Sequence, residues 1–319
     1  MQVRLIANPQ ASGVSLELVR QVAARLAPVA DVDVRLTQKP GHAVELAAED
    51  GADAVVAMGG DGTANEIANG VAEGALIGVI PAGATSVFAR QLRLPNRPLA
   101  AASAIAAALA EGRWRPVGLG SVNGRRFTFS AGFGLEAEAT RIVAERRRLR
   151  SDGRRPRDSA VVVAAARVLL ADRMRLPERI TLRAGPVTAR ASYVAVANQH
   201  PYTYWGRLPV RTAPLAGFAS ALDVVAVSGL RPFQLWRLGV YGLAWPRHAS
   251  GRDPLVAYLH DVVAADLTCD EPVGLQLDGE YLGHVTEAAI SYHPAAVRVL
   301  IPPSAAAAFP DPEREAAGT

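Results

Sequence analysis

The sequence contains a single cysteine, Cys269, among 319 residues. One thiol can form neither an intramolecular disulfide framework nor a cysteine metal cluster, so both kinds of site are excluded. The near absence of cysteine fits a reducing compartment. The first residues, MQVRLIANPQ, turn polar too early for a secretory leader. The sequence therefore predicts a cytoplasmic protein.

Long apolar runs are also lacking. The longest, at residues 159–171, falls short of the roughly 20 residues that a transmembrane helix needs. Half of the residues are hydrophobic and 20% are charged, which is typical of a soluble globular protein. The net charge is only +4, and arginine greatly outnumbers lysine. So mild a basic bias does not indicate nucleic-acid binding, and we expect no nucleic-acid partner.

Strand and helix patterns alternate in the first third of the chain. The apolar segments VRLIAN, DVDVRL, ADAVVAMG and ALIGVIP predict strands, and the intervening patterns predict helices at 14–26, at 42–49 and from Thr63. This alternation predicts an α/β domain with a mainly parallel sheet, whose functional loops follow the carboxyl ends of the strands.

Beyond Trp114 the pattern changes to many short strands joined by turns. Helices are expected only at 135–150, 159–171 and 233–243. Closely spaced strands predict a mostly antiparallel β-sandwich or flattened barrel. We therefore expect an N-terminal α/β nucleotide-binding domain at 1–112, a β-rich domain at 113–301 and a frayed tail at 302–319.

The string GGDGTANE, residues 59–66, lies between the third strand and a helix. Its glycines allow the backbone to approach a polyphosphate, and the helix N-terminus favours negative charge. Asp61 is a candidate Mg²⁺ ligand, and Thr63 offers a hydroxyl donor. An ordinary strand–helix turn capped by Asp or Thr is the alternative. The whole string after an apolar strand favours phosphate binding.

GGDGT is the signature shared by diacylglycerol kinases, sphingosine kinases, bacterial lipid kinases, NAD kinases and 6-phosphofructokinases. Further segments resemble the lipid-kinase branch in the same order, namely ANPQASG, Thr37, PAGATSVFARQL, SAGFGLEAEA and LQLDGE. This resemblance runs from residue 7 to about 300. It implies an ATP- and Mg²⁺-dependent lipid kinase with two domains, whose last strand often returns to the nucleotide domain.

The resemblance also implies roles for individual residues. Those expected to bind the nucleotide cofactor are Asn8, Pro9, Gly13, Thr37, Gly59, Gly60, Asp61, Gly62, Thr63, Asn65, Thr85 and Glu136. Glu280 is the expected general base, because a positioned carboxylate can accept the proton of a lipid hydroxyl as the P–O bond forms. Asp61 and Asp278 complete the catalytic set and are the expected metal ligands. An acidic β-turn is the alternative for Asp278-Gly279.

Several positions depart from the family pattern. Ala84, Ser86 and Val87 replace Thr, Asn and Asp in the proline loop, where Thr85 offers a displaced hydroxyl. Glu136 stands where the family has Asp, which keeps the charge on a longer arm. Residues 219–220 are Ala-Ser where many bacterial members have the Asp-Gly of a structural Mg²⁺ site, so the sequence does not support that second metal.

The sequence is less specific about the lipid that accepts the phosphate. The arginine-rich segment at 141–157 precedes an apolar helical pattern, which suggests peripheral contact with an anionic membrane surface; a solvated helix end is the alternative. The aromatic loop HPYTYWGR at 200–207 resembles a family segment that could line the acyl entrance or simply pack. Diacylglycerol, ceramide, a sphingoid base and a polyprenol-like alcohol all stay open as substrates. So do a homodimer, an NAD-kinase-like activity and a degenerate member that binds without catalysis.

Overall fold

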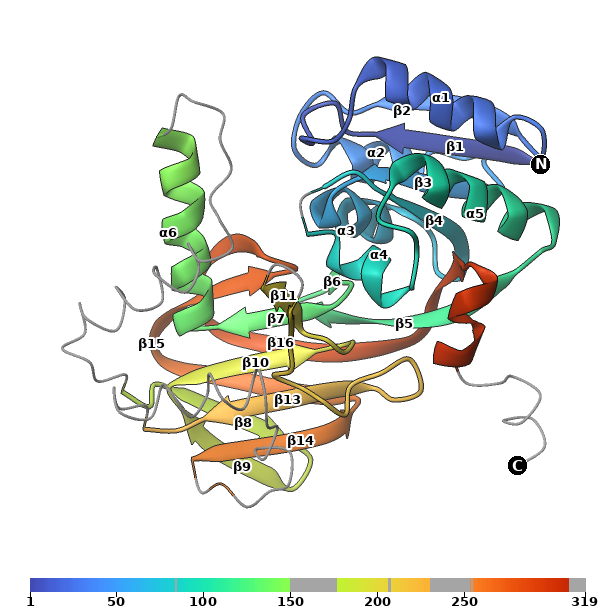
Figure 1. The fold of residues 1–319 in the computed structure, drawn as a ribbon. Coiled ribbons are helices and arrows are strands. Elements are labelled where there is room, and N and C mark those ends of the chain that lie inside the picture. The colour runs from blue at the N-terminus through green and yellow to red at the C-terminus, as the bar shows by residue number, and fades with distance from the viewer. Residues whose placement is uncertain (84, 150–176, 206–207, 230–252, 254, 310–319) are drawn as a thin grey trace, which may run out of the picture. The chain divides into compact units, whose positions relative to one another are not determined.

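The computed structural model describes residues 1–83, 85–149, 177–205, 208–229, 253 and 255–309. The chain forms two units, Met1–Leu119 with His293–Thr319, and Gly120–Tyr292 (Figure 1). The helices predicted at 159–171 and 233–243 lie outside the described residues, as do Ala84 and residues 150–157 of the basic segment.

The first unit contains a parallel sheet. Its strands are β1 (Gln2–Ala7), β2 (Asp31–Leu36), β3 (Ala54–Gly59) and β4 (Ala75–Pro81). They pair in the order β4-β3-β1-β2, and all of these pairs are parallel. β3 is buried along its whole length because a parallel sheet is covered on both faces. Parallel pairing also brings the carboxyl ends of the four strands to one edge, where the candidate site lies.

Helices cover this sheet. They are α1 (Leu16–Leu26), α2 (His42–Ala48), α3 (Asp61–Gly70), α4 (Val87–Gln91) and α5 (Pro98–Ala110). α1 packs with α5, and α2 packs with α3 (Figure 1). The Ser15 hydroxyl accepts from Leu18 N–H at 3.1 Å and caps α1. The Ala-rich α5, with proline in its first turn, was not predicted because it has almost no amphipathic periodicity.

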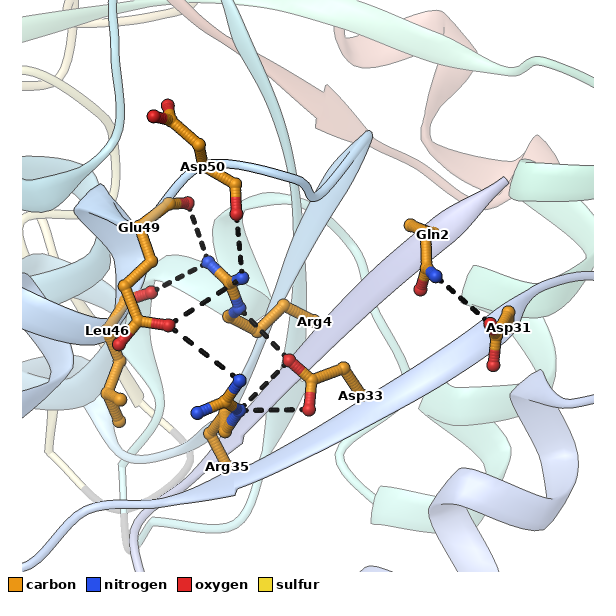
Figure 2. A network of polar contacts seen from close by, with 8 residues as sticks. All are labelled: Gln2, Arg4, Asp31, Asp33, Arg35, Leu46, Glu49 and Asp50. Atoms are coloured by element: carbon orange, nitrogen blue, oxygen red, sulfur yellow. Dashed lines mark hydrogen bonds and ion pairs between the residues drawn. The ribbon is translucent and has the colours of Figure 1, made fainter.

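A buried arginine ties β1, β2 and the end of α2 together (Figure 2). Arg4 lies opposite Asp33 in the parallel register, and its Nε donates to Asp33 Oδ2 at 3.3 Å. Its other nitrogens donate to three backbone oxygens in and just after the last turn of α2, those of Leu46, Glu49 and Asp50, at 2.7 to 3.1 Å. Carbonyls at a helix end lack partners within the helix, so the guanidinium satisfies them.

The second unit is strand-rich and antiparallel. Its elements are β6 (Arg125–Phe127), β7 (Ser130–Phe133), α6 (Leu135–Leu149), β8 (Ile180–Ala184), β9 (Val187–Ala191), β10 (Tyr193–Ala197), β11 (Thr203–Trp205), β12 (Leu208–Val210), β13 (Leu222–Val227), β14 (Val256–Val262) and β15 (Ala264–Leu277). β14, β13, β10, β7 and β15 are neighbours in that order, while β8 pairs with both β15 and β9. β11 and β12 form a separate hairpin. The coarse expectation of an α/β N-terminal region and a strand-rich C-terminal region is confirmed.

Two strands pass from one unit to the other, β5 (Trp114–Val122) and β16 (Glu280–Leu300). The first part of β16 pairs antiparallel with β15, and Val297–Val299 pairs parallel with β4. This one strand therefore pairs with strands of both units within a single hydrogen-bonded sheet. Residues Pro303–Ala308, expected in a frayed tail, form a 3-10 helix that buries Ala305 completely.

No helix within the described part of the chain is long and apolar enough to span a membrane.

Candidate functional site

The loops at the carboxyl edge of the first unit's sheet approach one another closely. Gly13 N–H donates to the Ala82 carbonyl oxygen at 3.1 Å, and a Cβ on Gly13 would lie 2.7 Å from that oxygen. A Cβ on Gly83 would lie only 2.6 Å from the Cα of Gly60. The loops after β1, β3 and β4 therefore meet backbone to backbone, which only glycine permits at these positions.

The GGDGT string forms the end of β3 and the start of α3, as predicted. Gly59 ends the strand, Gly60 is the N-cap, and Asp61 begins the helix. The N-cap residue Gly60 has no side chain that could cap the first turn of α3. The N–H groups and the positive dipole end of this ten-residue helix thus point toward the edge where the loops meet.

The Asp61 carboxylate holds the proline loop against this helix. Its Oδ2 accepts from Val87 N–H at 3.0 Å and its Oδ1 from Phe88 N–H at 3.1 Å. Both donors belong to the first turn of α4, which follows Ser86 at a φ of 48°. Because the donors are backbone amides, Asp61 makes these bonds whatever side chain stands at position 87, and the valine there does not remove them.

Asn8 connects the loop after β1 to the GGDGT string. Its amide nitrogen donates to Thr63 Oγ1 at 3.4 Å, and its Oδ1 accepts from Gln10 N–H at 2.9 Å. Thr63 is buried, and its hydroxyl lies so near Gly59 that a Cβ there would be 2.4 Å away. The structure therefore brings Asn8, Gly59 and Thr63 together.

Four further predicted nucleotide residues also lie on this unit. Thr37 follows β2, is buried, and donates its N–H to Ala7 O at 3.0 Å. Asn65 is buried in α3 and accepts from Asn69 through its backbone and side-chain oxygens. Pro9 is exposed next to Asn8, and Thr85 is partly exposed in the proline loop. Their nucleotide contacts stay predictions.

Glu66, for which the sequence predicted no role, is a structural part of this edge. Its two carboxylate oxygens accept from Gly41 N–H at 3.0 Å and Ala43 N–H at 3.1 Å. They cap α2, whose own N-cap is a glycine without a capping side chain. The residue before His42 is glycine and not one of the usual capping residues Ser, Thr, Asp or Asn. In the sequence, this was the sign that another element supplies the cap.

In the second unit, Asp278 anchors a tight turn. Leu277 and Glu280 pair directly, and the two residues between them, Asp278 and Gly279, have φ values of 49° and 79°. Positive φ at both positions is the two-residue hairpin for which Asp-Gly is favoured. The acidic β-turn that was one alternative for Asp278-Gly279 is therefore present. It leads directly into Glu280, the candidate base of the other alternative.

The Asp278 carboxylate is buried and accepts four hydrogen bonds. The donors are the N–H groups of Thr128, Phe129 and Ser130 and the Thr128 hydroxyl, at 2.7 to 3.0 Å. Burial raises the pKa of this carboxyl above its usual value, and the four donors oppose that rise. These contacts show that Asp278 holds the turn in place. A Mg²⁺ ion would compete with the four donors for the carboxylate oxygens. The metal role of Asp278 stays a prediction.

Glu280 follows the turn and is paired with Arg125 of β6. Arg125 Nη2 and Glu280 Oε2 are 2.8 Å apart, and both side chains are largely exposed. Arg125, which was not predicted from the sequence, is thus paired with the candidate base.

Glu136 lies at the start of α6 with its carboxyl group inside the protein. Tyr202, in the aromatic loop predicted at 200–207, donates its hydroxyl to Glu136 Oε2 at 2.6 Å. Burial raises the pKa of Glu136 to about 7, and the Tyr202 hydrogen bond offsets part of that rise. Tyr202 is therefore packed against Glu136, and the predicted role of Glu136 in nucleotide binding stays a prediction.

For the metal, no cluster of three or more His, Cys, Asp or Glu side chains suited to an ion occurs within the described ranges. Asp61 is the carboxylate at the edge where the glycine loops meet. Carboxylate oxygen is the chemistry that Mg²⁺ prefers, and Mg²⁺ commonly takes one or two carboxylates with water and phosphate oxygens. Asp61 therefore fits the expected ion better than Asp278 does.

Comparison with known proteins supports the resemblance. Residues 2–122 match the family described as the diacylglycerol kinase catalytic domain. A diacylglycerol kinase of Bacillus subtilis (strain 168) is 41% identical over 102 residues, 31% of this chain and 33% of that protein. A protein named probable lipid kinase YegS-like, from Pseudomonas aeruginosa (strain UCBPP-PA14), is 36% identical over 135 residues, 40% of this chain and 43% of its own. The matched region thus spans less than half the length of these relatives.

Solved structures share the fold over nearly the whole chain. A crystal structure of a diacylglycerol kinase from Bacillus anthracis str. Sterne has a TM-score of 0.70 at 19% identity, covering 95% of this chain and 98% of that one. An NAD kinase from Archaeoglobus fulgidus in complex with ATP has a TM-score of 0.53 at 12% identity, covering 96% and 95%. The predicted resemblance to diacylglycerol kinases and bacterial lipid kinases is confirmed by the matches of the N-terminal region.

Proposed function

Because residues 2–122 match the diacylglycerol kinase catalytic domain, we propose that this protein is an ATP-dependent lipid kinase. It transfers the γ-phosphoryl group to the hydroxyl of diacylglycerol or a related lipid alcohol. The observation that carries the proposal is the meeting of three glycine-containing loops beside the N-terminus of α3, whose N-cap is Gly60. Such an arrangement is suited to a polyphosphate.

On the nucleotide side, the close contacts of Gly13 with Ala82 and of Gly60 with Gly83 hold the loops in place before the nucleotide arrives. Preorganised backbone donors stabilise negative charge on the phosphates without reorganising during the reaction. Asp61 fixes the proline loop through its bonds to Val87 and Phe88. Mg²⁺ would be held at Asp61, where it would neutralise part of the polyphosphate charge.

On the acceptor side, Glu280 is the proposed general base. Its carboxylate accepts the proton of the lipid hydroxyl as that oxygen bonds to the γ-phosphorus, and the bond between the γ-phosphorus and the bridging oxygen breaks to release ADP. Asp278 fixes the turn before Glu280, and Arg125 holds the Glu280 carboxylate. The second unit thus presents one exposed, oriented carboxylate to an acceptor.

Contact with an anionic membrane is part of the proposal. The basic segment begins at Arg141 on α6, whose guanidinium is paired with Glu138 and Glu145. These pairs neutralise the first arginine of the segment, so any attraction to an anionic surface comes from the arginines that follow it in the sequence.

The proposal is tested by transfer of labelled phosphate from ATP in the presence of Mg²⁺. The acceptors are diacylglycerol, ceramide, a sphingoid base and a polyprenol, each in mixed micelles, together with NAD in solution. We expect a phosphorylated lipid, and less than about a tenth of the parental rate for Asp61→Asn, a loss of over about 1.4 kcal/mol of transition-state stabilisation. Asp50→Asn, at an exposed position, is the matched control and should keep the parental rate.

Two results would overturn the proposal. Phosphorylation of NAD in preference to every lipid would assign the NAD-kinase activity. Absence of transfer to any acceptor, with ATP bound normally in calorimetry, would assign a binding protein without catalysis.

A further inference from the structure

A continuous line of side chains joins Glu136 to the turn before Glu280. Tyr202 donates its hydroxyl to Glu136 Oε2 at 2.6 Å, and Gln276 Nε2 approaches the Tyr202 oxygen at 3.4 Å. Gln276 Oε1 accepts the N–H of Gly279 at 2.7 Å. The line therefore begins at a carboxyl group on α6 and ends at the backbone of the Asp278-Gly279 turn.

The absence of a side chain at Gly132 lets the members of this line meet. A Cβ at this position of β7 would lie 2.6 Å from Glu136 Oε2 and 2.8 Å from Gln276 Nε2. Both side chains therefore converge over the same backbone atom. Gln276 is almost fully buried, so its amide has no bulk water to replace these partners.

Glu136 is the group in this line that changes charge near neutrality. Its pKa is raised to about 7, chiefly by burial. The ionisable groups that act on it within the described part of the chain are the phenols of Tyr202 and of Tyr193 on β10, whose own pKa values are raised well above the usual range. The residues of β7 and β15 that lie next to Glu136 are Gly132 and Gln276, and neither of them titrates.

We propose that Tyr202 and Gln276 are positioning residues through which the protonation of Glu136 controls the Asp278-Gly279 turn and hence the placement of Glu280. The inference rests on the proposed function for its catalytic consequence, because Glu280 is the proposed base. The coupling itself is a property of the folded second unit and is measurable without any substrate.

The coupling follows from hydrogen-bond roles. As a carboxylate, Glu136 only accepts, so Tyr202 donates to it and keeps its oxygen available to the Gln276 amide. As a neutral acid, Glu136 gains an O–H donor that competes with Gln276 for the phenolic oxygen. Tyr202 then has the Ala131 carbonyl, 3.4 Å away, as another acceptor. The anionic form therefore fixes Gln276, and Gln276 fixes Gly279 N–H.

The first test follows the Gly279 backbone amide by NMR in the ¹⁵N-labelled, deuterated full chain between pH 5.5 and 8.5. In the parent, we expect its chemical shift to titrate with a midpoint at about pH 7, the pKa of Glu136. The titration should vanish in Glu136→Gln and in Tyr202→Phe. Tyr292→Phe is the matched control, because it removes a half-buried phenol acted on by Asp261, and it should keep the titration.

Persistence of this titration in Tyr202→Phe would overturn the inference. So would a Gly279 amide that does not move while the Glu136 carboxyl, followed by ¹³C labelling, titrates in the same sample. A Gly279 titration that survives in Glu136→Gln would assign it to the neighbouring Asp278 carboxyl and equally reject the coupling.

The second test uses turnover. The parental kcat on a short-chain lipid alcohol should rise through about pH 7, and this limb should be absent in Glu136→Gln. Gln276→Leu should lower kcat about tenfold at pH 8 with an unchanged KM for ATP, because it misplaces the base and leaves the nucleotide loops intact. An unchanged limb in Glu136→Gln, or a loss in Gln276→Leu confined to KM for ATP, would refute the positioning role. No turnover in the parent would instead refute the proposed function, and the NMR result would still decide the coupling.

Discussion

Glu136 should make the protein less stable as the pH rises toward neutrality. Its pKa is about 7 in the folded protein and 4.5 for an ordinary glutamate. Below pH 4.5 the carboxyl is neutral in both the folded and the unfolded chain. Between pH 4.5 and 7 the unfolded chain releases this proton while the folded protein retains it, so the free energy of unfolding falls with rising pH. Above about pH 7 the loss is complete.

The magnitude follows from the same two values. Each pH unit between them is worth about 1.4 kcal/mol, so ionised Glu136 costs the folded protein about 3 kcal/mol. Glu136→Gln keeps the size of the side chain and an acceptor oxygen for Tyr202 but cannot ionise. We therefore expect the variant to match the parent near pH 4.5 and to exceed its free energy of unfolding by about 3 kcal/mol at pH 8.

The assay is urea unfolding of parent and variant at pH 5, 6, 7 and 8, followed by circular dichroism and fluorescence. Coincident transitions are required, because two units can unfold separately. Glu287→Gln, on an exposed position of β16, is the matched control and should keep the parental pH slope. A Glu136→Gln variant whose stability falls with pH as steeply as the parent's would show that Glu136 does not carry the penalty.

Further predictions concern the turn, the base and the buried arginine. Glu280→Gln should lower turnover by roughly 10²–10⁴ with ATP affinity unchanged in calorimetry, because an amide cannot accept the proton; near-parental turnover, or rescue by added Mg²⁺, would move the base elsewhere. Asp278→Asn replaces an acceptor by a donor facing backbone N–H groups, so it should cost about 2–4 kcal/mol of stability. Rescue of its turnover by higher Mg²⁺ would instead support the metal role. Arg4→Met should cost about 3–5 kcal/mol in urea unfolding, since it leaves three carbonyls without their donor, although Asp33 keeps its pair with Arg35. Arg35→Met, at a half-exposed ion pair, should cost much less, and equal losses for the two arginines would contradict this view.

Local patterns were enough to predict much of the first unit. The expected helix at 42–49 is observed at His42–Ala48, and the helix expected from Thr63 begins two residues earlier, at Asp61. Both follow from apolar periodicity next to glycine turns, which are properties of neighbouring residues. The GGDGT string could be placed between a strand and a helix for the same reason.

Contacts between distant residues could not be predicted this way. The donors to Asp278 lie about 150 positions earlier in the chain, and Glu66 caps a helix that begins 24 residues before it. Tyr202 and Gln276 show no motif that would connect them to Glu136. Each of these pairings depends on how strands are brought together, so the side-chain types alone indicate polarity but not partners.

Because β16 pairs with both β15 and β4, the order in which the chain is synthesised matters for its folding. The edge of β4 that pairs with Val297–Val299 has no partner until the ribosome has made the whole second unit. During that interval the nascent first unit presents an open strand edge, the kind of surface on which chains associate wrongly. Translation speed across residues 120–296, and any chaperone that covers this edge meanwhile, should therefore govern the yield of native protein.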